Sequence, residues 1–596
     1  MLRRGSSVLV AARVTSQAHN ARLLSFSTSR HRRPNSTKTN PEEHVDVLIV
    51  GSGAGGLTAA LRAKSQGLRA AVIEKEATIG GASAISGGGI WIPCNPVSGV
   101  EDSREDALAY FDQAVGDVGP ASSMARRRAY VDNGYKMVEF LQQRGFKFHF
   151  AKGYSDYYPK MKGARGKGGG RSIESRVFNT NKLGRKWSAA LPPSTTPVAI
   201  YTNDAPVITK MTSSLRAFVQ STRIVLPLLA RTLLGQKLTS MGRGLVAQLL
   251  YLNIKHNNTD VRLNTSLADL IESPEGSIVG AKVLNPAGET STILASRGVI
   301  LAAGGFAHNR PLRDKHLPSP ASTAWTSSPK GDTGDAVLAG IKLGAATALM
   351  DDAWWGPTIF DPVSGKPHFA LIDRARPHCI IVDSSGRRFM NEAESYTDAG
   401  HHQYERNRRV RAIPAWLVMD RRHRDRYMLG TGLFARQRPK KAIEEGRMFV
   451  ADSVEGLAAK IGVDAQGLAG TVRRYNEMCE RGVDEDFGKG DNAYDNFFGD
   501  ASAGGKNPNM GPLAKAPYYA IEIWPGDLGT KGGLLTDEHQ RVLREDGGHI
   551  PGLYAIGNTA ASIMGRTYLG AGSTLGPAMT HGFLAVNHIA GNEKKP

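Results

Sequence analysis

The stretch from residue 45 to residue 74 constrains the fold of this chain more than any other. An apolar run, 45–50, is followed by a glycine run, a helix-like apolar segment and a second apolar run that leads into Glu74. This order predicts a buried parallel strand, a tight turn, a helix, a second strand and an acid. The glycine run reads Gly51-Ser52-Gly53-Ala54-Gly55-Gly56.

The glycine run and the acid predict a dinucleotide site. The first glycine permits the tight turn, the second lets backbone amides approach a pyrophosphate, and the last allows close packing of helix on strand. Glu74 stands where a carboxylate hydrogen-bonds a ribose hydroxyl. In a chain with 68 glycines, the alternative is a glycine turn in an unrelated α/β unit. The spacing of strand, helix, second strand and acid favours the dinucleotide.

Length and composition limit the class of protein. A chain of 596 residues is too long for one core, so we expect two joined domains and appendages. Cys94, Cys379 and Cys479 lack CxxC spacing, which indicates a reducing compartment and argues against disulfides, a zinc site or a thiol catalyst. The adjacent His401 and His402 point to different sides of a helix, so we expect solvated side chains rather than metal ligands.

The formal net charge of +20 is unevenly distributed. Residues 1–40 hold eight Arg or Lys and no acid, and a second basic cluster spans 160–186. No aromatic-basic RNA motif or helix-turn-helix pattern accompanies them, which argues against a nucleic-acid partner. Enrichment in Arg and Ser predicts that 1–43 is a mitochondrial targeting segment, with a disordered basic tail as the alternative. Folding is expected to begin near residue 44.

The remaining patterns predict an α/β fold with an inserted unit. A glycine-rich run at 80–91 exposes backbone amides and permits close approach of a flat ring. Strand-like runs at 261–263, 278–283 and 299–303 return to the first sheet, and similar patterning reappears near the C-terminus. We predict a Rossmann-like dinucleotide-binding domain (a parallel sheet flanked by helices) in two segments, with an α+β catalytic cap domain inserted between them. The segments are 44–312 and 526–596, and the cap is 313–525.

Residues 216–236 include an apolar run, 224–230, flanked by Arg223 and Arg231. The run is far shorter than the ~18 apolar residues of a membrane span. Two interpretations stay open. The segment is either a buried or lid helix, or a surface helix that contacts a membrane peripherally to collect an apolar substrate.

These segments together resemble the flavoprotein family of fumarate reductases and 3-ketosteroid dehydrogenases. The resemblance covers about 45–591 and rests on the glycine run, on 80–88, on 301–306, on 528–533 and on 554–582. It implies FAD as cofactor, bound non-covalently, because no histidine lies between Glu74 and Trp91, where covalently flavinylated relatives carry theirs. The predicted cofactor contacts are Gly51, Ser52, Gly53, Ala54, Gly55, Gly56, Glu74, Lys75, Gly80, Gly81, Ser86, Gly87, Gly88, Ala303, Gly304, Gly557, Asn558, Thr574 and Leu575.

The C-terminal block separates the subgroups of that family. Fumarate reductases carry an Asn-Arg-x-Gly-Gly run there, because a dicarboxylate needs cationic clamps. This chain has a tyrosine and glycines in 568–577, and is similar there to the 3-ketosteroid 1-dehydrogenases. By that resemblance the Tyr568 hydroxyl and the Gly572 amide bind a ketone oxygen that gains negative charge.

Two further tyrosines are implied by the same resemblance. Tyr396, at the end of 391–396, matches the base that removes the proton beside the ketone. A free phenol, with a pKa of about 10, is a poor base at neutral pH unless its phenolate is stabilised. Tyr157 matches the hydrogen-bond partner of the base, with Tyr158 as the alternative if the register differs by one. Taken singly, Tyr157 and Tyr396 are better explained as half-buried aromatics with satisfied hydroxyls, since the chain has 17 tyrosines, and only the three matching positions together favour the catalytic roles.

The resemblance implies an oxidoreductase that acts on a CH–CH bond. The expected reaction is FAD-dependent 1,2-dehydrogenation of a 3-keto steroid, or of a related 3-keto triterpenoid from secondary metabolism. The partners are then an apolar polycyclic ketone and an electron acceptor, either a quinone, oxygen or another carrier, and no metal is expected. Two rivals are a fumarate-reductase-like enzyme acting on a carboxylate-activated double bond and a catalytically silent flavin-binding protein. Residues 171–242 match the family motifs poorly, so the substrate mouth is expected to differ from that of bacterial steroid enzymes.

Overall fold

The glycine run lies at the centre of an eight-stranded sheet in the structure, a computed structural model that describes residues 42–591. β1 (Glu43–Val50) pairs in parallel with β2 (Ala70–Ile73) and β11 (Thr290–Leu301), as the apolar runs predict. Residues 1–41, which hold nearly all of the predicted targeting segment, lie outside the described residues. The other strands of this sheet are β8 (Asp260–Arg262), β9 (Ser266–Glu272), β10 (Ile278–Leu284), β20 (Arg541–Leu543) and β21 (His549–Ala555).

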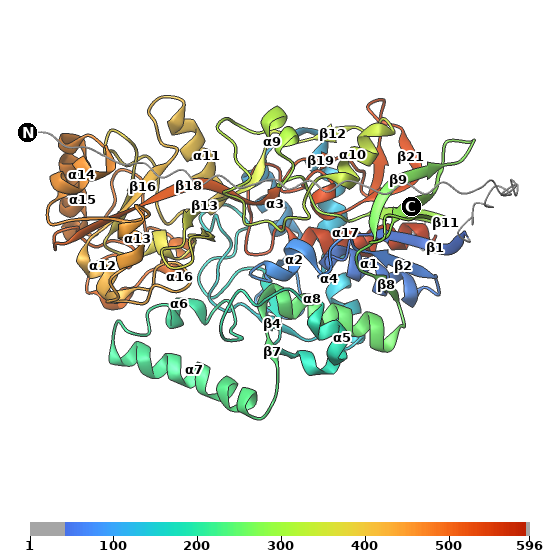
Figure 1. Cartoon of the computed structure of the whole chain (residues 1–596), viewed down its shortest axis with the longest axis horizontal. Coiled ribbons are helices and arrows are strands. Elements are labelled where there is room, and N and C mark those ends of the chain that lie inside the picture. Colours follow the sequence, from blue (N-terminus) through green and yellow to red (C-terminus); the bar gives the residue numbers. More distant parts are fainter. Residues whose placement is uncertain (1–41, 592–596) are drawn as a thin grey trace, which may run out of the picture. The chain divides into compact units, whose positions relative to one another are not determined.

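Helices α1 (Ala54–Ser65) and α17 (Leu575–Ile589) pack together over this sheet (Figure 1). Their shared core joins alanines of α1, aliphatic side chains of β1 and β2, and the end of α17. A Cβ on Gly56 would contact the carbonyl oxygen of Gly51, so glycine is needed where the helix leaves the strand. Helix α17 therefore returns the last segment of the chain to the first strand–helix unit.

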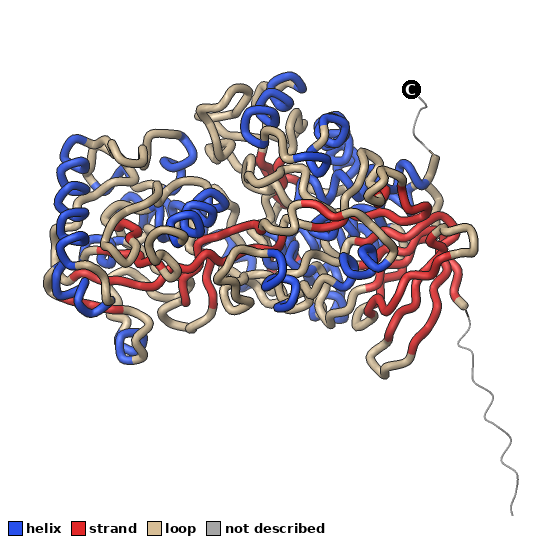
Figure 2. Tube along the Cα trace, turned by 90° about the horizontal axis from the view of Figure 1, so that it is seen from above, coloured by secondary structure: helices blue, strands red, loops and turns tan. Residues whose placement is uncertain are grey.

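A second sheet of six strands lies mostly within the segment predicted to be the cap, with the end of one strand beyond it. In Figure 2 strands lie toward both ends of the structure, with many of the helices between and beside them. The predicted boundaries at 312/313 and 525/526 fall inside α9 (Arg310–His316) and β18, and the three-part division stays a prediction. The strands of the second sheet are β13 (Ala353–Phe360), β14 (Pro367–Phe369), β15 (Cys379–Val382), β16 (Ala415–Met419), β17 (Phe449–Ala451) and β18 (Tyr518–Thr530).

Helices and short ribbons complete the described part of the chain. The remaining helices are α2 (Gly81–Ile85), α3 (Arg104–Val115), α4 (Met124–Gln143), α5 (Gly184–Ala189), α6 (Ala205–Ile208), α8 (Met241–Tyr251), α10 (Asp335–Lys342), α11 (Tyr396–Asn407), α12 (Arg421–Arg426), α13 (Lys440–Glu444), α14 (Val454–Ile461), α15 (Ala465–Arg481) and α16 (Ala493–Phe498). The remaining strands are β3 (Ile90–Trp91), β4 (Phe148–Phe150), β5 (Ser172–Ser175), β6 (Phe178–Asn179), β7 (Leu238–Thr239), β12 (Thr347–Ala348) and β19 (Gly533–Leu534).

The apolar helix predicted within 216–236 is α7 (Leu215–Leu233), and most of its surface is exposed. Only Ala217 and Ser221 are buried. The interpretation as a buried helix is therefore wrong. No helix among residues 42–591 is long and apolar enough to cross a bilayer.

Candidate active site

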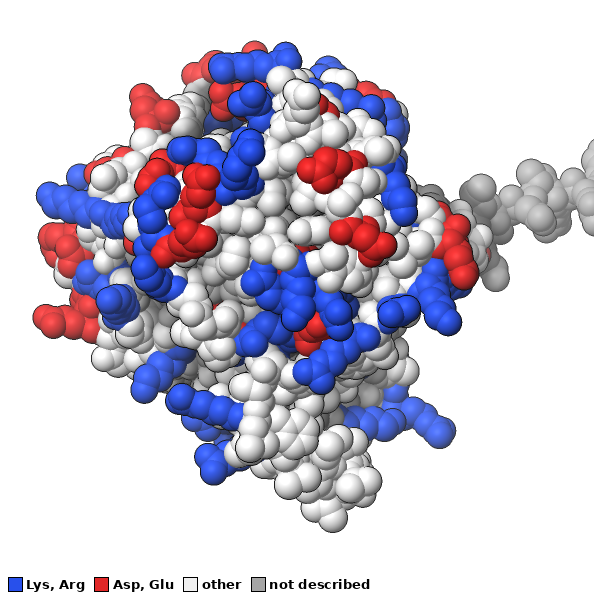
Figure 3. Space-filling model, turned by 90° about the vertical axis from the view of Figure 1, so that its left-hand side faces the viewer, with Lys and Arg blue, Asp and Glu red and all other residues white. Residues whose placement is uncertain are grey.

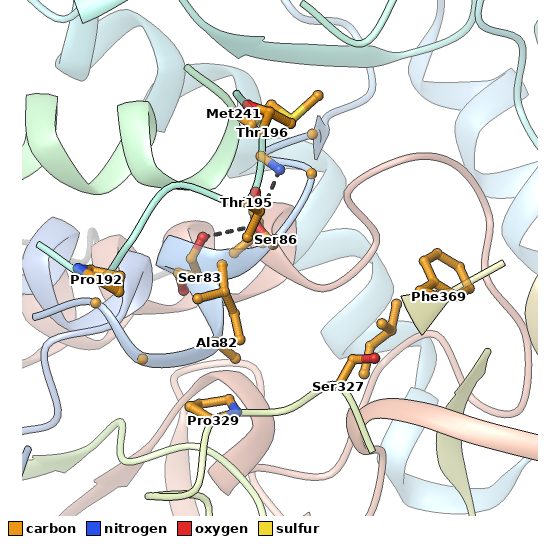
Figure 4. A pocket seen from close by; sticks show the side chains of 18 of the residues that line it. Ala82, Ser83, Ser86, Pro192, Thr195, Thr196, Met241, Ser327, Pro329 and Phe369 are labelled. Atoms are coloured by element: carbon orange, nitrogen blue, oxygen red, sulfur yellow. Dashed lines mark hydrogen bonds between the residues drawn. The ribbon is translucent and has the colours of Figure 1, made fainter. Parts of the chain in front are cut away.

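One cavity of about 1390 Å³ is lined by residues of both large sheets. Its wall includes the glycine turn after β1, the run at 80–89, the start of α17 and the end of β14. Figure 4 shows part of this wall, with Ser83 and Ser86 on one side and Phe369 on the other. Every residue predicted to contact the cofactor lines the cavity except Ala54, and it is also lined by Tyr157, Tyr396, Tyr568 and Gly572.

Glu74 lies at the carboxyl end of β2 and is held against the glycine turn. Its Oε2 accepts hydrogen bonds from the Ser52 amide at 3.1 Å and from the Ser52 hydroxyl at 2.6 Å. The Ser52 hydroxyl accepts one from the Gly80 amide at 2.8 Å. The acid, the turn and the second glycine run are thereby joined beside the N-terminus of α1, where the pyrophosphate and ribose of a dinucleotide bind side by side.

Ala54 and Lys75 are predicted cofactor contacts that hold other segments of the chain. The Ala54 amide donates to the Ser83 hydroxyl at 3.0 Å, and Ala54 does not line the cavity. Lys75 does line it, but its Nζ forms an ion pair with Asp335 at 2.6 Å. The serine therefore ties the run at 80–89 to the start of α1, and the lysine ties the strand end to α10.

The other end of the cavity fits a flat ring. Gly88 and Gly572 have φ angles of +73° and +103°, which other residues rarely adopt. A Cβ on Gly572 would also contact the backbone of Gly89, so the two segments approach closely. Thr574 and Leu575 line this end at the start of α17, where the positive end of the helix dipole suits an electron-rich ring edge. Together with the pyrophosphate and ribose positions, this donor set fits FAD.

Three predicted catalytic tyrosines form one aromatic cluster beside the ring site. The ring of Tyr396 lies 5.5 Å from that of Tyr157 and 4.8 Å from that of Tyr568, measured between centroids, and the rings of Tyr157 and Tyr568 are stacked at 5.3 Å. The Tyr157 hydroxyl donates to the Tyr396 hydroxyl at 3.5 Å and is 3.0 Å from the Tyr154 hydroxyl. The alternative, Tyr158, does not line the cavity and donates to Asp398 at 3.1 Å. The register with Tyr157 therefore places its hydroxyl beside the proposed base.

Burial controls the acidity of this cluster. It raises the pKa of Tyr157 and Tyr396 well above the usual value of a phenol. Neighbouring phenols raise both pKa values further, whereas the hydrogen bond with Tyr157 lowers the pKa of Tyr396. Burial also raises the pKa of Tyr568, but hydrogen bonding with Tyr396, Thr574 and the Gly572 amide opposes that rise. Tyr568 is thus a protonated donor at neutral pH, and Tyr396 can accept a proton only when its phenolate is stabilised.

One sequence-based interpretation changes at this site, that of His401 and His402. Beside it, Trp354 supports the tyrosine cluster, because its ring packs edge-on against Tyr568 at 5.4 Å and its Nε1 donates to Asn558 at 3.0 Å. His401 and His402 are not simply solvated: they lie 2.8 Å from Asp352 and 2.7 Å from Glu394. Within residues 42–591, no cluster of three or more His, Cys, Asp or Glu side chains is placed to hold a metal ion.

For several residues that line the cavity, the sequence does not predict a place in the site. Phe369 packs edge-on against Tyr396 at 4.9 Å, yet nothing in its local sequence marks it. Asp332 and Asp335 line the cavity, although the sequence explains them as turn and helix-cap residues. Burial raises the pKa of Asp332 to about 7. The Asp332 carboxylate lies so close to Gly304 that a Cβ on Gly304 would touch it. The glycine-acid pattern at 331–335 is the sequence signal that could have indicated a role for Asp332 in the cavity wall.

A dinucleotide-binding sheet that shares its cavity with a buried tyrosine cluster defines the class of this protein as a flavoenzyme. Residues 46–575 match the FAD binding domain family. The chain is 43% identical to a 3-oxosteroid 1-dehydrogenase of Mycobacterium tuberculosis, over 92% of this chain and 98% of the relative. It is 35% identical to a 4-oxocyclohexanecarboxylate 2-dehydrogenase of Sinomonas cyclohexanicum, over 92% and 94%.

A solved structure leads to the same family assignment. The 3-ketosteroid Δ1-dehydrogenase of Sterolibacterium denitrificans, in complex with 1,4-androstadiene-3,17-dione, superposes with a TM-score of 0.86 at 37% identity, covering 92% of this chain and 100% of that one. The chain therefore belongs to the FAD binding domain family and groups there with the 3-oxosteroid 1-dehydrogenases. It is an FAD-dependent oxidoreductase that acts on CH–CH bonds.

Glu74→Ala tests the dinucleotide end of the cavity. We expect the dissociation constant of FAD to rise by roughly 10- to 100-fold, because a charge-assisted hydrogen bond contributes about 1.5–3 kcal/mol. Fluorescence titration of the apoprotein with FAD measures it, with the exposed Glu101→Ala as control. Unchanged FAD affinity in a folded Glu74→Ala protein would contradict the assignment.

Proposed function

We propose that this enzyme catalyses the 1,2-dehydrogenation of a 3-keto steroid, or of a related 3-keto triterpenoid, giving a 1-ene-3-one. The observation that carries the proposal is the position of Tyr157, Tyr396, Tyr568 and Gly572 in one cavity with the FAD cradle. The names of the relatives support it, since those at 33–43% identity are dehydrogenases of cyclic ketones.

In this proposal the ketone oxygen accepts hydrogen bonds from the Tyr568 hydroxyl and the Gly572 amide. These donors stabilise the negative charge that develops on the oxygen and so acidify the neighbouring C2–H. Tyr396 acts in its phenolate form and takes the C2 proton, which makes it a neutral phenol, and the Tyr157 hydroxyl donates to the same oxygen and so favours the phenolate. FAD, when bound, supplies the acceptor for the C1 hydrogen and its electron pair. The C1–C2 double bond forms as both hydrogens leave.

The cavity wall beside the tyrosine cluster suits an apolar ligand. Phe369, Leu371 and Leu528 line it there, with no charged side chain among them. Arg376 also lines the cavity, but its guanidinium donates to two carbonyl oxygens and to the Thr209 hydroxyl. Lys330 and Lys366 line the cavity as well, but among residues 42–591 no Lys or Arg lies over the rings of the tyrosine cluster. This argues against a fumarate-reductase-like activity, because a dicarboxylate needs free cations beside the reacting atoms.

Two further parts of the proposal concern where the enzyme works. Residues 216–236 contact a membrane peripherally, which the outward apolar surface of α7 supports. The basic, acid-free composition of residues 1–40 supports mitochondrial targeting.

Anaerobic titration of the purified holoenzyme tests the reaction. Addition of a 3-keto steroid with a saturated A ring should bleach the oxidised flavin band and yield the 1,2-alkene in equal amount. If a panel of 3-keto steroids and triterpenoids leaves the flavin oxidised, while dithionite bleaches it and fumarate re-oxidises it, the proposal fails in favour of the fumarate-reductase-like rival.

Arg374 is expected to set the pH dependence of this reaction. Its guanidinium is fully buried and donates to the carbonyl oxygens of Glu392 at 2.6 Å and Glu394 at 2.7 Å, just before Tyr396. No carboxylate among residues 42–591 forms an ion pair with it. Burial raises the pKa of Tyr154, and the Arg374 charge is among the effects that oppose it. We infer that Arg374 is a positioning residue whose charge favours a phenolate at Tyr154, which the Tyr157 hydroxyl links to Tyr396.

The rate constant kcat is expected to rise with pH as the phenolate forms. In Arg374→Met this rise should occur at higher pH, because loss of a buried positive charge raises the pKa of a nearby phenol. Arg374→Lys should restore part of the shift. The other acids near the cluster, Glu394 and Asp398, are engaged by His402 and Tyr158. A uniform loss of rate at every pH in both variants would show a purely structural role.

A further inference from the structure

The mouth of the cavity carries an outward apolar surface with basic residues beside it. We propose that this mouth docks on an anionic phospholipid bilayer and that the apolar substrate enters the cavity directly from the bilayer. The inference rests on the proposed function for the class of substrate. It extends the peripheral contact stated above by naming the lipid charge, a second element of the surface and the route of entry.

One face of helix α7 packs against the protein and the other is exposed. Ala217 and Ser221 pack against the rest of the protein. The opposite face is exposed, although it consists of large apolar side chains that recur at the helical period. The exposed fractions are 79% for Leu215, 51% for Phe218, 40% for Val219, 61% for Leu226, 46% for Leu229 and 88% for Leu233. Such a concentration marks an interaction surface rather than scattered surface residues.

The exposed face of α7 is continuous with the cavity. Leu226 and Leu229 are both exposed and part of the cavity wall, and Val225 lines the wall beside them. An apolar molecule resting on these leucines therefore reaches the cavity without crossing open water. The ketone end of such a molecule can then advance toward Tyr568.

Two loops of the second sheet form another side of the mouth. They are joined by the Thr431 amide, which donates to Asp361 at 2.6 Å. Thr431 and Asp361 both line the cavity. Beside them Val363 and Phe434 are 53% and 52% exposed. The mouth thus presents apolar side chains from α7, from Val363 and from Phe434, three segments far apart in the sequence, which makes a single planar partner a better fit than a peptide bound to α7 alone.

The charge around α7 identifies the kind of bilayer. Residues 205–259 contain no Asp or Glu. Arg216 and Arg223 form no hydrogen bond or ion pair through their side chains within residues 42–591. Figure 3 shows uncharged atoms protruding at the lower end of this face, with Lys and Arg around them. In Figure 1, α7 lies at that lower edge. An amphipathic helix with an apolar face and arginines beside it lies in the interface of an anionic membrane. The Lys and Arg residues within 205–259 are Lys210, Arg216, Arg223, Arg231, Lys237, Arg243 and Lys255.

Vesicle flotation of the holoenzyme tests the docking without any turnover. Vesicles of phosphatidylcholine mixed with phosphatidylglycerol should carry the protein, and salt should reduce the bound fraction. Arg216→Gln with Arg223→Gln should lower partition by roughly twentyfold, because each arginine near an anionic surface contributes about 1 kcal/mol. Phe218→Ser with Leu233→Ser should lower it about tenfold by removing buried apolar area. Neither pair lines the cavity.

Matched controls are substitutions of exposed residues outside the mouth. Arg297→Gln with Arg473→Gln, and Leu338→Ser with Val483→Ser, should leave vesicle binding unchanged. All variants should keep the wild-type rate on a 3-keto steroid delivered from cyclodextrin, and the mouth variants should lose rate only when the steroid is supplied in anionic vesicles. This separates failure of the docking from failure of the proposed reaction.

Three results would overturn the proposal. The first is a wild-type enzyme that is active on cyclodextrin-delivered steroid but does not float with anionic vesicles. The second is vesicle binding that all mouth variants retain. The third is self-association without vesicles that Phe218→Ser with Leu233→Ser abolishes, which would make a second copy of the chain the occupant of this surface.

Discussion

Tyr396→Phe should lower kcat by about a thousandfold while the enzyme keeps its FAD. The substitution removes only the phenol oxygen, so the ring contacts with Tyr157, Phe369 and Tyr568 persist. A positioned general base typically contributes between about a hundredfold and ten-thousandfold. Within residues 42–591, the bases that line the cavity next to Phe369 are His368 and Asp373, and they are bonded to each other. Anaerobic single-turnover bleaching of the flavin by a 3-keto steroid measures the loss directly.

Tyr404→Phe is the matched control, because Tyr404 lies on the same helix, α11, is also buried, and donates to the Pro320 carbonyl away from the cavity. It should change kcat by less than about twofold, since it touches neither substrate nor cofactor. Loss of exchange of the C2 hydrogen with solvent should accompany the Tyr396 effect. A Tyr396→Phe enzyme that bleaches at a rate near wild type would assign the proton transfer to another group.

The part of the site that the sequence predicts is the part fixed by local chain geometry. A glycine run between two apolar strands leaves few conformations, and the approach of Gly56 to Gly51 requires the glycine. Glu74 follows β2 at once, so its position depends on only one strand. The tyrosines were predicted by resemblance, and the structure brings Tyr157, Tyr396 and Tyr568 together from three distant segments.

The parts of the site that the sequence does not predict depend on contacts between segments that are distant in the sequence. Phe369 reaches Tyr396 because β14 pairs with β13, a pairing that the short segment 367–369 does not encode by itself. The apolar run of α7 has the composition of a buried helix, and composition alone does not distinguish a protein interior from a lipid-facing surface. Arg374 looks like any surface arginine in the sequence, and only its burial beside Tyr154 gives it a role in the electrostatics of the site.

Tyr568→Phe should lower kcat by roughly 100- to 1000-fold, the usual effect of removing one donor to a developing oxyanion, worth about 3–4 kcal/mol. The ring should stay in place, because it is stacked on Tyr157 and supported by Trp354. The other donor cannot be tested in the same way. A side chain at Gly572 would contact Gly89 and would have to adopt a φ of +103°. Tyr568 is therefore the donor through which the oxyanion arrangement can be measured.

The two tyrosines act on the same step, which gives a sharper test than either alone. If Tyr568 stabilises the enolate that forms as Tyr396 takes the proton, the double variant Tyr396→Phe with Tyr568→Phe should lose much less than the product of the single losses. The affinity for a non-reactive 3-keto steroid can be measured from the shift it causes in the flavin spectrum. We expect Tyr568→Phe to weaken this affinity only several-fold, because the Tyr568 hydrogen bond becomes strong only as negative charge develops on the ketone oxygen. Equal losses in binding and in kcat/KM would instead assign Tyr568 to ground-state recognition of the ketone.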